Sequence, residues 1–135
     1  MKKVLGALVG VGVLAAAASP ALAHHSGAMF DREKEVSLAG TVKEFQYTNP
    51  HSWLQVNVPD ASGKVTVWGF EAEGPSTLLR AGIKKSTFMP GDKVTVKGHP
   101  MKDGRPGAGL MSVTKADGSV ISPQPGQRRP AAAAG

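Results

Sequence analysis

Three histidines and one glutamate are the residues of this chain whose types and positions best suit the binding of a metal ion. His24 and His25 follow the small-residue segment Ala21-Leu22-Ala23, and His51 lies in the segment Asn49-Pro50-His51. A histidine at the start of a protein chelates a cation through its α-amine and its imidazole, and such nitrogen donors favour Cu(II) over the other common divalent ions. We therefore predict a Cu(II) site that uses His24, with His25 and His51 as further ligands.

Other interpretations of these residues are open. Histidines on an N-terminal arm can simply be solvated, and His51 can serve only to complete a turn beside Pro50. Glu71 is the carboxylate expected near His51, as an extra ligand or paired with Glu73, although two such glutamates can also be a solvated strand end. His99, at the end of a later strand, is an alternative partner for the metal.

The chelate exists only if the chain begins at His24 after processing. Residues 1–3 are Met-Lys-Lys, and an uncharged apolar run from Val4 to Ala18 precedes the breaker Pro20 and the A-x-A sequence of residues 21–23. This pattern is typical of a secretory signal peptide over residues 1–23. The apolar run is shorter than the roughly 20 residues that cross a bilayer as a helix. We predict a periplasmic protein, cleaved after Ala23, with no membrane span.

Length and charge limit what the exported part can be. Removing residues 1–23 from the 135 leaves 112, which suits one domain with one core. Of the 16 Lys and Arg, four lie in the signal peptide and the tail. The remaining part of the chain therefore has 12 basic residues and 10 acidic ones. This balance disfavours a nucleic-acid partner, which requires a concentrated basic face. The absence of cysteine excludes disulfides and thiolate ligands.

Alternating apolar and polar residues predict a five-stranded barrel. The pattern has the two-residue period of half-buried strands, and Gly74-Pro75 and Gly82 bracket a short helix. Three strands, a helix and two strands are the order of the OB barrel, an all-β fold. Leu78 and Leu79 would close one end of it. The expected segments are an arm over 24–34, a barrel domain over 35–121 with strands at 35–47, 51–58, 65–71, 94–98 and 110–114, and a disordered tail over 122–135.

The second and third strands form a hairpin whose register can be tested by its pairs. Pairing positions whose numbers sum to 123 places Val56 opposite Val67 on an aliphatic inner face. The opposite face would then be an outer patch that needs a cover or a ligand. The residues of this patch are Trp53, Gln55, Trp68 and Phe70.

This outer patch gives an alternative function, a binding module for a planar ligand, a sugar or a peptide. The N-terminal arm is the other possible cover. We expect the first strand to begin at the barrel end opposite His51, so the arm, with a reach of about 36 Å, would run back along the barrel. Met29 and Phe30 would then lie over Trp53 and Phe70.

An enzyme is the class that the sequence supports least. The chain has no cysteine nucleophile, and none of its serines lies in the G-x-S-x-G setting of a nucleophile elbow. We therefore expect a non-enzymatic binding protein.

Four segments together resemble a family of small secreted bacterial proteins of unknown function, over about residues 23–121. The segments are AHHSGAMFD, GTVKEFQYTNPHSWLQVNV, GPSTLLRAG and MPGDKVTVKG. The W-x-x-E element of the family is matched by Trp68 to Glu71. Tyr47 stands where the family often has Trp, and Gly74 stands where it has Ser, which removes an N-capping hydroxyl from the helix. The resemblance implies an OB-like fold and export, and it implies no activity.

Overall fold

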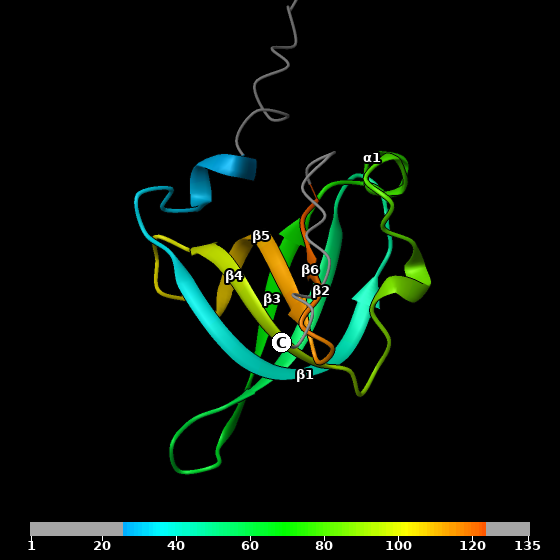
Figure 1. Cartoon of the computed structure of the whole chain (residues 1–135). Helices are drawn as coiled ribbons and strands as arrows, with labels where there is room; N and C mark the ends of the chain where they lie inside the picture. The colour runs from blue at the N-terminus through cyan, green and yellow to red at the C-terminus, as the bar shows by residue number, and fades with distance from the viewer. Residues whose placement is uncertain (1–25, 124–135) are drawn as a thin grey trace, which may run out of the picture.

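The computed structural model describes residues 26–123. The predicted signal peptide, the pair His24 and His25, and residues 124–135 of the predicted tail lie outside the described residues. Figure 1 shows a β-barrel with short helical segments at one end. The elements in chain order are the 3-10 helix η1 (Ser26–Met29), β1 (Val36–Gln46), β2 (Ser52–Pro59), β3 (Val65–Ala72), the helix α1 (Pro75–Arg80), the 3-10 helix η2 (Lys85–Thr87), β4 (Lys93–Pro100), β5 (Gly107–Lys115) and β6 (Val120–Ile121).

The strands form a closed five-stranded barrel with one additional short strand. Neighbouring strands follow the order β3-β2-β1-β4-β5-β6, and β5 also pairs with β3 in parallel, which closes the barrel. This order, with α1 between β3 and β4, confirms the predicted all-β fold, a five-stranded barrel with one short helix between the third and fourth strands. No helix within residues 26–123 is long and apolar enough to cross a membrane.

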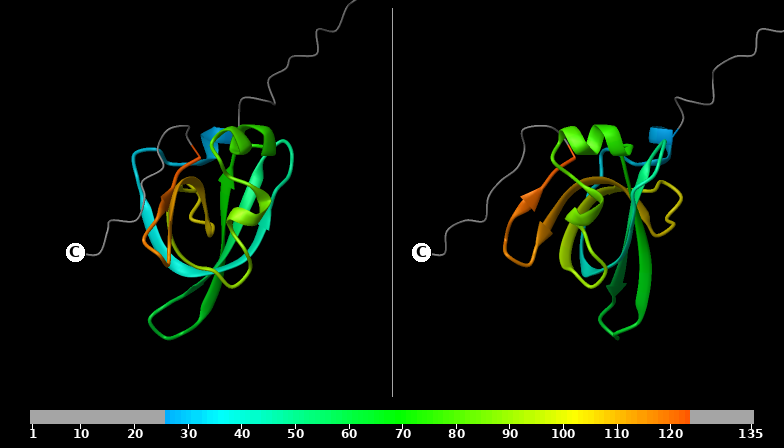
Figure 2. Two further views of the ribbon diagram at one scale, coloured as in Figure 1. Left: turned by 45° about the vertical axis from the view of Figure 1, so that its right-hand side comes forward. Right: turned by 90° about the vertical axis from the view of Figure 1, so that its right-hand side faces the viewer.

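β1 bends sharply because it pairs with two strands in succession. It pairs with β4 from Val36 to Thr41 and with β2 from Thr41 to Gln46, and a bulge separates Val42 from Glu44. The bend brings both ends of β1 to the barrel end that carries η1 and α1 (Figures 1 and 2). The expectation that β1 starts opposite His51 was therefore wrong, since bulges and bends of this kind close small barrels.

The loop between β2 and β3 sets a register one residue away from the predicted one. The Asp60 N–H donates to the Lys64 carbonyl at 2.9 Å, and the Gly63 N–H donates to the Asp60 carbonyl at 3.0 Å. Gly63 has a φ of 85°, which glycine adopts without strain. This tight loop pairs positions whose numbers sum to 124, so Leu54 lies opposite Phe70.

The corrected register turns two aromatic residues toward the interior. Phe70 is fully buried, and Trp68, opposite Val56, packs against the core. Their rings stack at a centroid distance of 6.2 Å. The predicted outer patch of Trp53, Trp68 and Phe70 was therefore wrong for Trp68 and Phe70.

Helix α1 closes the barrel end with one leucine. Leu78 is fully buried, whereas Leu79 is 57% exposed, so the predicted plug of two leucines is correct only for Leu78. The last helical residue is Arg80, and Gly82 terminates the helix as predicted: its φ of 79° lets the following Ile83 N–H donate to the Leu78 carbonyl at 2.8 Å.

The N-terminal arm packs against β4 and β5. Phe30 is 6% exposed and forms a β-bridge with Met101. The Asp31 N–H donates to the Pro100 carbonyl at 2.8 Å, and the Lys102 N–H donates to the Met29 carbonyl at 2.9 Å. The prediction that Phe30 covers Phe70 was therefore wrong, because Phe70 lies inside the barrel.

Gly40 is the residue at which the bend of β1 leaves no room for a side chain. An added Cβ would overlap the carbonyl oxygen of Asn57 and lie 2.8 Å from a methyl carbon of Val56. We expect Gly40→Val to lower the free energy of unfolding by roughly 1–3 kcal/mol, as overpacking does in cores. Urea denaturation measures this loss. Ala39→Val is the control, since Ala39 is exposed on the same strand, and equal stability of the two variants would contradict the packing at Gly40.

Candidate functional site

Residues from four neighbouring strands, two of them with ionisable side chains, form a row at the barrel end near the arm. His99 of β4 is the register partner of Gly109 in β5, and Gly109 is the partner of Glu71 in β3. Glu71 in turn lies opposite Trp53 in β2. His51 comes directly before β2, so it lies at the edge of this row. The barrel thus places an imidazole beside a carboxylate on adjacent strands.

The imidazole of His51 lies in close contact with the carboxylate of Glu71. The Nδ1 atom of His51 lies 3.2 Å from Oε1 of Glu71, with side-chain exposures of 33% for His51 and 9% for Glu71. The two groups therefore interact through their charges, and Nδ1 is the ring nitrogen of His51 that faces the carboxylate. The structure thus brings His51 and Glu71 together, as expected, and their role as metal ligands stays a prediction.

The turn before β2 holds His51 in place. Thr48 donates its hydroxyl proton to the His51 carbonyl at 2.9 Å, and the Thr48 N–H donates to Oγ of the buried Ser52 at 3.3 Å. The peptide bond between Asn49 and Pro50 is cis. These contacts fix the backbone on both sides of the imidazole.

Burial raises the pKa of Glu71 above its ordinary value of 4.5. The positive charge of His51 lowers this pKa, and the negative charge of Glu73 raises it, but burial is the largest of the three effects. The folded protein therefore binds a proton at Glu71 more tightly than the unfolded chain does. The contribution of Glu71 to stability consequently decreases as the pH rises from 4.5 through the folded-state pKa.

His99 has a structural contact that occupies one of its nitrogens. Its Nδ1 lies 2.8 Å from the carbonyl oxygen of Lys34, and since a carbonyl only accepts, Nδ1 donates. His99 thereby ties the residues before β1 to the end of β4. Within residues 26–123 no group of three or more His, Asp or Glu side chains could hold a metal ion, so the pair of His51 and Glu71 is at most half of a site.

Trp53 and Gln55 are the residues of the predicted ligand patch that stay on the outer face of β2. Both lie against Gly69 of β3, where an added Cβ would be 3.4 Å from the Trp53 ring and 3.2 Å from Oε1 of Gln55. Trp68 and Phe70 face the interior, so a stacking platform of three aromatic rings does not form. Of the four residues predicted to bind a ligand, only the Trp53 ring and the Gln55 amide lie on the outer face.

Two features of the site were missed from the sequence. The ring of Phe30 lies over Gly109, where an added Cβ would be 3.3 Å from it, and so the arm is anchored next to Glu71 in the register. A groove beside β1 is the second feature, described below. The contact of Phe30 with Gly109 had a signal in the sequence, because a glycine inside a strand often marks the close approach of another group.

Fold and site together define a small β-barrel domain whose N-terminal arm is anchored beside a buried carboxylate and its histidine partner. The chain belongs to a family of unknown function, DUF6152, whose model matches residues 11–111. This confirms the resemblance to a family without a known function. Comparison with curated proteins and with solved structures finds no match.

The titration of Glu71 tests the electrostatics of the site. We expect its carboxyl carbon to titrate in NMR spectra with a midpoint above 4.5. His51→Gln should raise the midpoint further, because it removes a positive charge, and Glu73→Gln should lower it, because it removes a negative one. Glu35→Gln, an exposed glutamate before β1, is the control and should leave the midpoint unchanged. Shifts of the same sign in the His51 and Glu73 variants would contradict this arrangement.

Proposed function

We propose that this protein is an exported, non-enzymatic domain that binds Cu(II) through a site completed by its processed N-terminus. The α-amine and imidazole of His24 would chelate the ion, with His51 as the ligand from the barrel and His25 as a further donor. Glu71 would hold His51 in place and is close enough to serve as an additional ligand. The observation that carries the proposal is the pair of His51 and Glu71 at the barrel end where the arm is anchored.

The length of the arm between Phe30 and His24 is sufficient for His24 to reach His51. Phe30 is seated on Gly109, the register partner of Glu71. The six steps of chain from Phe30 back to His24 span at most about 20 Å. Strands lie about 4.8 Å apart, so the Glu71 backbone is one strand away from the anchor of the arm. His24 can therefore reach His51 without the long return path that the sequence had suggested.

The chemistry of the donors supports Cu(II). An amine and imidazoles are nitrogen ligands, for which Cu(II) has the highest affinity among the common divalent ions. A carboxylate that accepts from Nδ1 of a histidine orients the other ring nitrogen, Nε2, toward a metal and raises its basicity. In this protein the two atoms that would form such a contact, Nδ1 of His51 and Oε1 of Glu71, lie 3.2 Å apart. Binding requires the amine and the imidazoles to lose their protons, so affinity should increase with pH.

Calorimetric titration of Cu(II) into the purified exported protein tests this function. N-terminal mass spectrometry first establishes that the protein begins at His24. We expect one equivalent of Cu(II) to bind with a micromolar or tighter dissociation constant, and the affinity to fall by at least about tenfold in His24→Ala, which leaves the amine but removes a ring nitrogen. His51→Ala should weaken binding as well.

Two controls separate this site from adventitious binding. A protein with one extra methionine before His24 keeps every side chain but moves the α-amine, and it should lose the tight site. His99→Gln should keep it, because the proposed ligand set does not include His99, whose Nδ1 donates to the Lys34 carbonyl. Absence of saturable uptake, an exported protein that starts elsewhere, or equal binding by the methionine-extended protein would refute the proposal.

A further inference from the structure

The second half of β1 has an edge that no strand of the described residues covers. β4 pairs with β1 only as far as Thr41, and the next residue, Val42, exchanges hydrogen bonds of 2.8 Å with Asp92 and Gly91. From Glu44 to Gln46 β1 pairs with β2 on one side. On the other side, within residues 26–123, neither a strand nor a hydrogen-bonded loop backbone pairs with it. An open strand edge presents N–H and C=O groups to an added strand.

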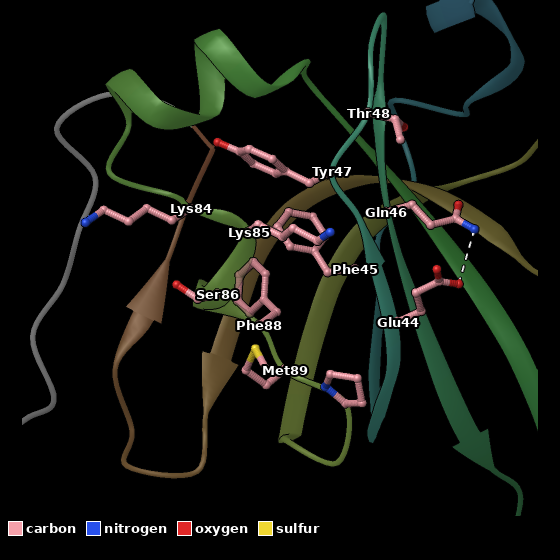
Figure 3. Close-up of a pocket in the computed structure, with 11 residues that line it drawn as sticks. Glu44, Phe45, Gln46, Tyr47, Thr48, Lys84, Lys85, Ser86, Phe88 and Met89 are labelled. Carbon is pink, nitrogen blue, oxygen red and sulfur yellow. Dashed lines mark hydrogen bonds between the residues drawn. The ribbon is translucent and has the colours of Figure 1, made fainter.

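A groove of about 820 Å³ runs along this open edge. One wall is β1 and the other is the segment from Lys84 to Pro90, which contains η2 (Figure 3). Its floor is aromatic, because the rings of Phe45 and Phe88 meet edge to face at a centroid distance of 5.2 Å. Met89 lies at the same wall and is 51% exposed. Phe45 and Phe88 belong to the core and are 6% and 1% exposed, so Met89 supplies most of the apolar surface that the groove offers beside the β1 backbone.

Tyr47 and Lys115 hold the far wall in position. The Tyr47 hydroxyl lies within hydrogen-bond distance of the carbonyls of Pro75, at 3.0 Å, and Ile83, at 2.9 Å. The Lys115 ammonium group donates to the Thr87 carbonyl at 2.8 Å and lies 6.0 Å from the centre of the Phe88 ring. Tyr47 connects the end of β1 with residues 75 and 83, and Lys115 connects β5 with Thr87. These contacts hold the segment from Lys84 to Pro90 in position, so the groove does not need a ligand to form.

The charge at the groove is positive. Lys84 and Lys85 are exposed on the wall opposite β1. Glu44 is the acidic residue of the groove, and its side chain points to the other side of β1, where it accepts a 3.3 Å hydrogen bond from the Gln46 amide (Figure 3). Of the two lysines, Lys85 is directed toward β1 and Lys84 away from it (Figure 3), so an acidic ligand would meet Lys85 in the groove and Lys84 at its rim.

We propose that this groove binds an extended, acidic segment of a partner protein, which adds to the open edge of β1 as a further strand. The backbone groups of residues 44–46 that point away from β2 would pair with the peptide. Apolar side chains on one face of the peptide would contact Met89, and acidic side chains would meet Lys85 and, at the rim, Lys84. The chain's own tail suits the groove poorly, because residues 124–135 contain Arg128 and Arg129 and no acidic residue.

Fluorescence anisotropy with a labelled octapeptide that alternates valine with glutamate tests the proposal on the full chain. We expect saturable binding, and binding at least about tenfold weaker for the matched peptide that alternates valine with lysine. Amide signals of residues 44–46 should shift in NMR spectra and exchange more slowly in the complex. The double variant Lys84→Glu with Lys85→Glu should weaken the acidic peptide about tenfold.

Matched controls test whether the peptide binds in the groove and whether another segment occupies the groove instead. The double variant Lys93→Glu with Lys97→Glu changes two exposed lysines of β4 outside the groove, and it should bind as the parent does. No saturable binding, or equal loss in both double variants, would overturn the proposal. Amide shifts that depend on protein concentration alone would assign the groove to a second copy of the chain. A large gain in affinity on deletion of residues 124–135 would assign it to the tail, and either result would also overturn the proposal.

Discussion

β1 pairs with β4 along its first half and with β2 along its second, and it can do so only because it bends. The bend needs a residue without a side chain at Gly40, where the Asn57 carbonyl is in contact, and an extra residue at the bulge between Val42 and Glu44. Barrel closure depends on this geometry, since a straight strand of this length could not reach both neighbours. The positions of the arm, of the pair of His51 and Glu71, and of the groove all follow from it.

The bend returns both ends of β1 to one end of the barrel, and the candidate site residues His51 and Glu71 lie at this end. The arm that precedes β1 is anchored on Gly109 and tied by His99, while the residues that follow β1 form the turn that carries His51. Glu71 lies between these two groups, buried enough for its pKa to be raised. A carboxylate that is costly to ionise and has one histidine partner gains from an additional cation, which is what the proposed site would supply.

The same bend leaves the second half of β1 with an open edge. A barrel strand normally has a neighbour on each side, which removes the edges on which other chains could add. Here the segment through η2 spans the gap, and its contacts through Tyr47 and Lys115 keep it away from the β1 backbone. An aromatic floor, a free edge and two lysines then coincide in one place.

The sequence by itself determined the five strands of the barrel and their order along the chain, the position of the helix and the nearness of His51 to Glu71, but it did not predict the short strand β6. These follow from local periodicity and from a turn and a hairpin, which involve few residues. The register of β2 with β3 did not follow, because β3 has apolar residues on both faces, Val65 and Val67 on one and Trp68 and Phe70 on the other. Only the hydrogen bonds of the loop around Asp60 and Gly63 chose between the two faces.

Tertiary structure alone decided where the arm lies, which aromatic rings are buried and that β1 has an open edge. Each of these depends on the curvature of β1 and on contacts between residues far apart in the chain, such as Phe30 with Gly109 and Tyr47 with Ile83. Alternation of apolar and polar residues reports which face of a strand is buried, but it contains no information on how far that strand bends or where its partner ends. The direction of the chain in space therefore had to come from packing.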